Sequence, residues 1–206
     1  MAGCTPSHSF KLEIVERAHP QRKEVEHYIS QRYELAFDAH LDAFMPTFLA
    51  LMEEGKVRSL CGFRVASEEP LFLEQYLDLP ADVLLTHVYG NKIARHELIE
   101  FGQLASFSKG FSALHFLLMT EYLVESGYEW CIFTATDPLN AMMNRLGLET
   151  VTLAEADPSR IPNATDIWGS YYQHQPRIVA GNLKQGVSQL RALFNQSTHR
   201  IVGGAQ

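Results

Sequence analysis

The segment from Leu98 to Leu148 constrains the fold of this chain more than any other. It starts as an apolar strand-like run, crosses a turn of small residues at 106–112, and continues as a long amphipathic helix pattern that ends near Gly127. A second apolar run at 129–136 and a short helix pattern that stops at Gly147 follow. A strand, a helix and a second strand in this order predict an α/β fold.

The turn in this segment is predicted to bind an anion. A strand that enters a helix through a turn of glycine and serine leaves free backbone N–H groups that point at one spot, and a phosphate is a typical partner for them. The alternative is an ordinary helix start, in which the serines cap the helix and Lys109 is solvated. The anion-binding interpretation selects Ser106, Ser108, Lys109, Gly110, Phe111, Ser112 and Ala113.

Hydrophobic periodicity divides the rest of the chain into short strands and helices. Strands are expected at 9–16, 47–52, 57–65, 92–107, 150–153 and 176–180, and helices at 20–37, 71–77, 81–89, 138–146 and 183–195. Gly102 inside its strand suggests a bulge or the close approach of another backbone or a ligand. The pattern weakens at 155–172, where loop signals precede an aromatic segment, 168–172, that could form the wall of a pocket. No repeat or linker is present, so we expect one domain at 9–195, with disordered tails at 1–8 and 196–206.

Composition argues against several classes of protein. The formal net charge of −7 and the lack of a basic stripe argue against binding to nucleic acid through phosphate contacts. No apolar run approaches the ~18 residues of a membrane-spanning helix, and the N-terminus lacks the pattern of a signal peptide. The three cysteines and nine histidines show no metal-ligand spacing, so no metal site is expected. These features predict a cytoplasmic protein with no integral membrane association.

The segment from Leu98 to Leu153 resembles the GNAT superfamily of N-acyltransferases. In that superfamily the turn after the fourth strand carries Gln/Arg-x-x-Gly-x-Gly/Ala and holds the pyrophosphate of acyl-CoA; here Gly110 matches and Ser112 is a small substitute. The ending Arg145-Leu146-Gly147-Leu148 is similar to the usual Tyr-x-x-x-Gly-Phe. The resemblance implies a mixed, mostly antiparallel sheet with a V-shaped splay, flanked by helices.

Two positions depart from the superfamily pattern. Phe107 replaces the Gln or Arg of the turn, which removes a usual side-chain contact to the cofactor. Met143 stands where a tyrosine often protonates the departing thiolate, so another residue or water must do so in an acyltransferase of this sequence.

Over nearly the whole chain, from Ala18 to Gly181, the sequence is similar to the thermostable hemolysin family. The resemblance rests on distinctive blocks at 16–20, 28–33, 62–64, 71–77, 103–106, 133–136, 145–148 and 168–172. The family name implies cell lysis, but no pore-forming pattern is visible, and a name drawn from a lytic phenotype fits equally well an enzyme whose product is lytic. A looser similarity to acyl-homoserine-lactone synthases covers Arg32, Phe37 and the strand 100–104, with Gly102 and Gln103 in place of Ser and Arg.

Glu100 and Glu74 are the candidate catalytic residues. Burying a carboxylate on an apolar strand costs free energy unless the carboxylate has a charged partner or a catalytic role. Burial would also raise the pKa of Glu100 toward that of a general base. Glu74 could pair with Arg32 or Arg64 in an amine-binding pocket. Simple alternatives are a glutamate on the open face of the strand and a structural salt bridge. The candidate substrate-binding residues are Arg32, Tyr33, Gln75, Gln103 and Trp168.

The sequence therefore predicts a GNAT-like acyltransferase that moves an acyl group from a thioester to an amine-bearing small molecule. The co-substrate would be an acyl-CoA or an acyl carrier protein, and the carrier protein is a possible partner. The alternatives are a membrane-active lytic protein and a GNAT-shaped binding module without catalysis. The absence of a Gly-x-Ser-x-Gly elbow argues against a hydrolase.

Overall fold

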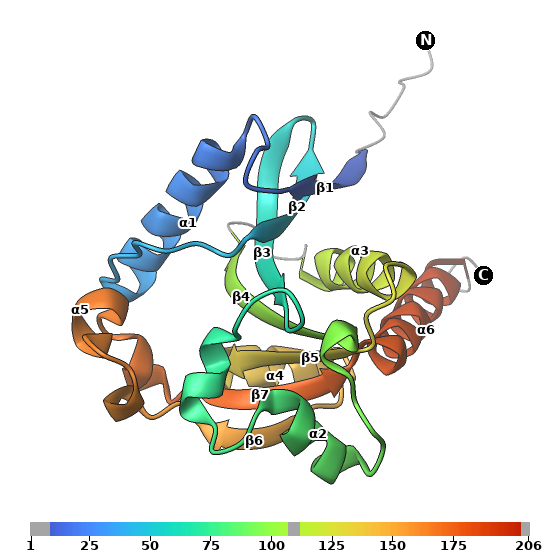
Figure 1. The fold of residues 1–206 in the computed structure, drawn as a ribbon. Coiled ribbons are helices and arrows are strands. Elements are labelled where there is room, and N and C mark those ends of the chain that lie inside the picture. Colours follow the sequence, from blue (N-terminus) through green and yellow to red (C-terminus); the bar gives the residue numbers. More distant parts are fainter. Residues whose placement is uncertain (1–8, 107–111, 203–206) are drawn as a thin grey trace.

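The computed structural model describes residues 9–106 and 112–202, and it contains one sheet of seven strands in the order β1-β2-β3-β4-β5-β7-β6 (Figure 1). The strands are β1 (Phe10–Val15), β2 (Thr47–Glu53), β3 (Lys56–Val65), β4 (Leu98–Ser106), β5 (Trp130–Ala135), β6 (Val151–Glu155) and β7 (Arg177–Asn182). The α-helices are α1 (Arg22–Phe37), α2 (Ala81–Tyr89), α3 (Ser112–Glu125), α4 (Asp137–Arg145), α5 (Ala164–Trp168) and α6 (Leu183–Val202).

Helices cover both faces of the sheet. Alternate residues of each strand point to opposite faces, so Ile99 and Phe101 join the core beneath α3 and α6, whereas Leu98 packs under α2. On that second face, Val25 and Ile29 of α1 pack over β2 and the end of β4. The mixed sheet with helical flanks confirms the predicted fold class.

The first four strands are antiparallel, and β2 joins β3 through a tight hairpin. Its two connecting residues, Glu54 and Gly55, have φ angles of 51° and 76°. Positive φ at both central residues suits the right-handed twist of a two-residue hairpin. The strands expected at 47–52 and 57–65 therefore form an antiparallel hairpin.

The sheet opens between β4 and β5. These strands are parallel and pair only at Leu98–Trp130, Ile99–Cys131 and Glu100–Ile132. Beyond these pairs β5 continues to pair with β7, from Trp130–Asn182 to Ala135–Arg177. The two central strands thus diverge toward their C-terminal ends, which is the V-shaped splay that the superfamily resemblance implied.

A bulge bends β4 just beyond the last paired residue. Leu60 of β3 pairs with Ala105, whereas Gly62 pairs with Gly102, so Gln103 and Leu104 together lie opposite Cys61. Gln103 adopts a φ of 53°. An extra residue of this kind increases local twist and bends its strand. The bulge suggested by Gly102 is thus present, and it directs β4 away from β5.

The segment between α1 and β2 is fastened over this bulge. The Gln103 side chain accepts a hydrogen bond from Met45 N–H at 2.9 Å and donates one to the Ala43 carbonyl at 2.8 Å. Arg22 donates to the Met45 carbonyl at 2.6 Å. The Met45 side chain therefore lies across two backbones that have no side chain there, at Gly62 and Gly102.

Several elements differ from the sequence expectation. The helix expected at 71–77 is a 3-10 turn, η1 (Phe72–Tyr76), and another 3-10 turn, η2 (Arg95–Glu97), occupies the start of the expected strand at 92–107. The expected loop at 155–172 contains η3 (Pro158–Arg160) and α5, followed by η4 (Tyr171–His174). Helix α6 continues to Val202, beyond the expected end at 195. Prolines and glycines mark boundaries but do not show how short the intervening turns are.

Alanine substitutions at Gly62 and Gly102 are expected to have unequal effects on stability. A Cβ at position 62 would lie 2.5 Å from Met45 Cβ and 2.8 Å from the Phe48 ring, whereas one at position 102 would meet the flexible end of Met45 at 2.2 Å. Gly62→Ala should lower the free energy of unfolding by about 1–3 kcal/mol, the usual cost of overpacking. Gly102→Ala should cost less, because a methionine terminus can rotate. Urea unfolding of both variants tests this, and equal losses would contradict the described packing.

Candidate functional site

A cavity of about 470 Å³ occupies the opening between β4 and β5. Its walls come from both strands and from α1, α3, α4 and α6. Most of the lining side chains are apolar, and the larger ones include Phe101, Leu104, Phe116, Met119, Phe133, Leu139, Met142, Met143, Leu148 and Leu183. The volume lies within the range of sites that enclose small ligands.

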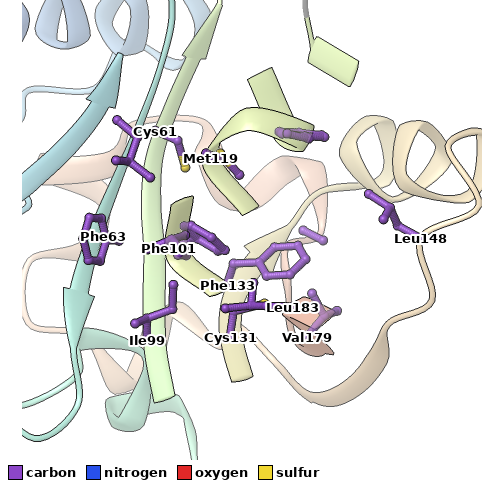
Figure 2. Close-up of a cluster of buried hydrophobic side chains, with 14 of the residues drawn as sticks. Cys61, Phe63, Ile99, Phe101, Met119, Cys131, Phe133, Leu148, Val179 and Leu183 are labelled. Carbon is purple, nitrogen blue, oxygen red and sulfur yellow. The ribbon is translucent and has the colours of Figure 1, made fainter. Parts of the chain in front are cut away.

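Two phenylalanines stand where the strands part. Phe101 and Phe133 directly follow the last paired residues, Glu100 and Ile132. Their ring centroids lie 6.5 Å apart in an edge-to-face arrangement (Figure 2). Alternation along each strand places both on the α3 and α6 face, with Leu183 and Val179 nearby in the same cluster. Local sequence thus makes this part of the cavity strongly apolar.

The predicted anion-binding turn lies partly at one edge of this cavity. Ser106 ends β4, Ser112 begins α3, and both line the cavity. Arg32 of α1 also lines it and donates a hydrogen bond to the Ser106 carbonyl at 3.1 Å. Ala113 lies in the first turn of α3 but not in the lining. The other predicted cofactor-binding residues, Ser108, Lys109, Gly110 and Phe111, lie outside the described residues.

Aromatic residues form the wall nearest α1. Tyr33, Phe37 and Tyr171 line the cavity. Trp168 does not, although its ring lies 6.3 Å from Tyr33 and 5.8 Å from Tyr171. The Tyr171 hydroxyl is hydrogen-bonded to Thr134, and burial raises the pKa of this phenol to about 12. Trp168 therefore supports the wall from behind, and the aromatic segment 168–172 does border a pocket.

Glu100 points to the opposite side of β4 from Phe101 and is not in the cavity lining. Its side chain is 1% exposed. Leu73 N–H of η1 donates to one carboxylate oxygen at 2.8 Å, and Arg64 Nε lies 3.4 Å from the other. Burial raises the pKa of Glu100 to about 7, in spite of these two favourable contacts. The carboxylate is thus poised for proton transfer near neutral pH but is enclosed beneath η1.

Glu74 and Gln75 lie away from the cavity. Glu74 forms an ion pair with Arg95 at 2.7 Å and accepts a hydrogen bond from Ala81 N–H at 2.9 Å. The expectation that it pairs with Arg32 or Arg64 is therefore wrong. Although burial opposes ionisation, the hydrogen bonds from Arg95 and Ala81 lower the pKa of Glu74 overall. Gln75 is exposed and donates to the Phe72 carbonyl within its own turn.

The sequence selected only some of the residues that line the cavity. Gln103 was selected and does line it, and its side-chain amide is hydrogen-bonded to the backbone of residues 43–45. Helices α4 and α6, however, contribute Leu139, Met142 and Gly186 to the lining, and none of these was a candidate. The apolar positions on one face of α4 indicated that this face is buried. A sequence alone, however, does not distinguish a helix face that packs on a core from one that lines a cavity.

Comparison with known proteins identifies the family. The model of the family described as thermostable hemolysin matches residues 15–187. This chain belongs to the thermostable hemolysin family. The resemblance drawn from the sequence blocks is thereby confirmed. No curated protein matches the sequence significantly.

Solved structures of similar fold include three that are described as synthases. FeeM, an N-acyl amino acid synthase from uncultured soil microbes, aligns with a TM-score of 0.61 at 12% identity over 89% of this chain and 96% of FeeM. The acyl-homoserine-lactone synthase LasI aligns at 0.56 and 14% over 86% and 91%. The CoA-dependent acyl-homoserine-lactone synthase MesI aligns at 0.54 and 16% over 90% and 95%. At these identities the likeness shows that this hemolysin-family chain shares their fold.

Two classes of feature are not found within residues 9–106 and 112–202. No helix there has the length and apolar character needed to cross a membrane. The same part of the chain contains no cluster of three or more histidine, cysteine, aspartate or glutamate side chains arranged to hold a metal ion.

Glu100→Gln is expected to change how stability depends on pH. Because the folded-state pKa of about 7 exceeds the ordinary 4.5, the folded protein retains a proton that the unfolded chain loses. The stabilisation is fully present below about pH 4.5 and is lost as pH rises through 7. The wild type should therefore lose about 3 kcal/mol relative to Glu100→Gln over this interval. Urea unfolding of both proteins at a series of pH values measures it.

The wild type and the variant must be compared at each pH because His115 changes stability with pH in the opposite direction to Glu100. Burial lowers the pKa of His115 to about 4, so the stability of both proteins falls as pH drops from about 6.5 toward 4. Glu74→Gln serves as a matched control: with its lowered pKa, Glu74 contributes stability that is lost as pH falls through its folded-state pKa. A stability difference between wild type and Glu100→Gln that does not change with pH would show that folding does not raise the pKa of Glu100.

Proposed function

We propose that this protein is an acyltransferase that moves a long acyl chain from a thioester to an amine-bearing small molecule. The observation that carries the proposal is the apolar cavity of about 470 Å³ between the diverging ends of β4 and β5. An extended thioester fits such an opening, because unpaired strand edges offer backbone N–H groups to its polar atoms while apolar side chains bury its chain. The structural neighbours described as N-acyl amino acid and acyl-homoserine-lactone synthases support the same class of reaction.

The donor is proposed to enter from the N-terminus of α3. Its phosphate groups would lie near the 106–113 segment, where the positive end of the α3 dipole attracts anions. Ser106 and Ser112 border the cavity at this edge. Its acyl chain would then extend past Phe101 and Phe133 toward Leu148 and Leu183. CoA and acyl carrier protein present the same phosphopantetheine chemistry at this edge, and MesI is described as CoA-dependent.

Glu100 is the proposed general base for the amine. In the reaction the amine nitrogen attacks the thioester carbonyl carbon, the base takes a proton from that nitrogen, and the carbon–sulfur bond breaks to release a thiol. A carboxylate with a pKa of about 7 is well matched to this task at neutral pH. Access of the amine to Glu100 requires η1 to release the carboxylate that Leu73 N–H now binds. Glu74 is not proposed as a base, because Arg95 and Ala81 already occupy its oxygens.

This reaction offers a physical explanation for the family name. An amine joined to a long acyl chain has a polar head and an apolar tail, and such amphiphiles enter lipid bilayers and disrupt them. Lysis would then come from the product, with the protein acting as its catalyst. The alternative is that the protein itself disrupts membranes, as the name thermostable hemolysin would suggest.

Turnover should depend strongly on the length of the acyl chain. Each methylene buried in an apolar cavity contributes about 0.8 kcal/mol, which is about fourfold in affinity. Thiol release is therefore expected to be faster, at subsaturating donor, with decanoyl-CoA than with acetyl-CoA by at least tenfold, with a pool of amino acids and primary amines as acceptors. The same chains on acyl carrier protein should be assayed in parallel. If no donor releases thiol or raises the melting temperature, the proposed function is wrong.

Membrane leakage should require the complete reaction. Phosphatidylcholine vesicles filled with a fluorescent dye should remain intact with the pure protein alone and leak when decanoyl-CoA and the amine pool are added. Glu100→Gln should lower the rate of leakage in step with its rate of thiol release. Leakage by the protein without substrates, at the same rate for wild type and variant, would favour direct lysis.

A further inference from the structure

We propose that the hydroxyl of Tyr33 donates a hydrogen bond to the carbonyl oxygen of the bound thioester and so stabilises the negative charge that develops there. The inference rests on the proposed function and adds a catalytic residue to it. Tyr33 comes from α1, an element remote in sequence from the strands that form the opening. Its position, the free state of its hydroxyl and the lack of a hydroxyl group among the α4 residues that line the cavity support this role.

Tyr33 lies at the bulge of β4. It lines the same cavity as Gln103 and Leu104, the two residues that form the bulge, and as Cys61, which lies opposite them on β3. The phenol is close enough to Cys61 and Tyr171 for both to influence its ionisation. The bulge lies within the unpaired part of β4, beyond Glu100, so the reacting carbonyl of a thioester extended through the opening would pass beside it.

The ring of Tyr33 is held from two sides. Phe37, one turn further along α1, lies with its ring 5.6 Å from the Tyr33 ring. Trp168 of α5 approaches edge-on at 6.3 Å. These contacts fix the ring without using the hydroxyl. A donor with a fixed position is what stabilises a developing charge most effectively, because little reorganisation is needed during the reaction.

The hydroxyl itself has no hydrogen-bond partner among the described residues. Neighbouring polar groups are committed: the Tyr171 hydroxyl bonds to Thr134, and the Gln103 amide binds the backbone of Ala43 and Met45. Burial, followed by the proximity of Tyr171 and Cys61, raises the pKa of Tyr33 well above its ordinary value. The phenol therefore stays protonated at neutral pH and remains available as a donor.

Helix α4 offers no hydroxyl to this cavity, and the polar residue that it contributes to the lining, Arg145, lies at its C-terminal end. Leu139, Met142 and Met143 contribute only apolar atoms to the lining there. A carbonyl oxygen that gains charge in an apolar cavity needs hydrogen-bond donors, since no solvent replaces them. Tyr33 meets this need from the opposite wall. Its hydrogen bond strengthens as the carbonyl oxygen becomes negative, and no proton has to leave the phenol.

Tyr33→Phe tests the proposal because it removes one oxygen and retains the ring. The expected result is a loss of about 100-fold in kcat for thiol release, with the KM for the donor changed by less than threefold, as for removal of one oxyanion donor. The melting temperature should stay the same or rise, because an unpaired buried hydroxyl contributes no hydrogen bond to the fold. A second readout is the carbonyl stretching frequency of a bound long-chain thioester without an amine: it should be lower in the wild type than in Tyr33→Phe.

Tyr89→Phe is the matched control. Tyr89 lies on α2, packs on Trp130 with a centroid distance of 4.4 Å, and is not part of the cavity lining. This variant should retain kcat and the carbonyl frequency of the wild type.

The possible results separate the role of Tyr33 from the proposed acyltransferase function. If the wild type releases thiol and Tyr33→Phe retains kcat within threefold, the role of Tyr33 is refuted and the proposed function stands. A clearly lower melting temperature for Tyr33→Phe would show that the hydroxyl serves the fold, and would also refute the role. If the wild type neither turns over nor binds a thioester, the proposed function fails and the role of Tyr33 fails with it.

Discussion

The structure depends on the early end of pairing between two parallel strands. β4 and β5 share three residue pairs and then separate, because β4 is bent by its bulge while β5 continues to pair with β7. Backbone N–H and C=O groups normally find partners within the protein, and strand edges that lack them bind other chains or ligands. An opening of this kind in the middle of a sheet is therefore a feature that other residues must stabilise. This opening determines where the cavity lies. The apolar walls of the cavity and the packing around Met45 surround it.

Maintaining the opening has a cost in stability. An apolar cavity without a ligand lowers stability by about 24 cal/mol for each Å³ that remains empty. Gln103 offsets part of this cost by binding the backbone at Ala43 and Met45, and Arg22 binds that same segment from α1. Methionines at 119, 142 and 143 line the cavity. Their unbranched side chains adapt to irregular space, which suits a site that closes around chains of different length.

The local pattern of the sequence predicted much of the sheet and its central motif. Alternating and continuous apolar runs identified the strands, and Gly102 suggested a bulge that is present. Tertiary contacts could not be predicted in the same way. Glu74 was expected near Arg32 or Arg64 but pairs with Arg95, which follows it by 21 positions. The enclosure of Glu100 depends on how η1 packs over it, with Leu73 N–H bound to the carboxylate, and the meeting of Tyr33 with the bulge depends on the direction of α1. Neither is encoded in a local spacing.

We propose that the opening between β4 and β5 holds an acyl thioester. A crystal structure with a non-reactive thioether analogue of a long-chain acyl-CoA tests this most directly. With an S-(2-oxoalkyl) analogue, whose ketone replaces the thioester carbonyl, we expect the acyl chain to lie between Phe101 and Phe133, the ketone oxygen within hydrogen-bond distance of Tyr33, and the phosphates at the start of α3. An analogue bound elsewhere on the protein, with the opening closed or filled by protein side chains, would contradict it.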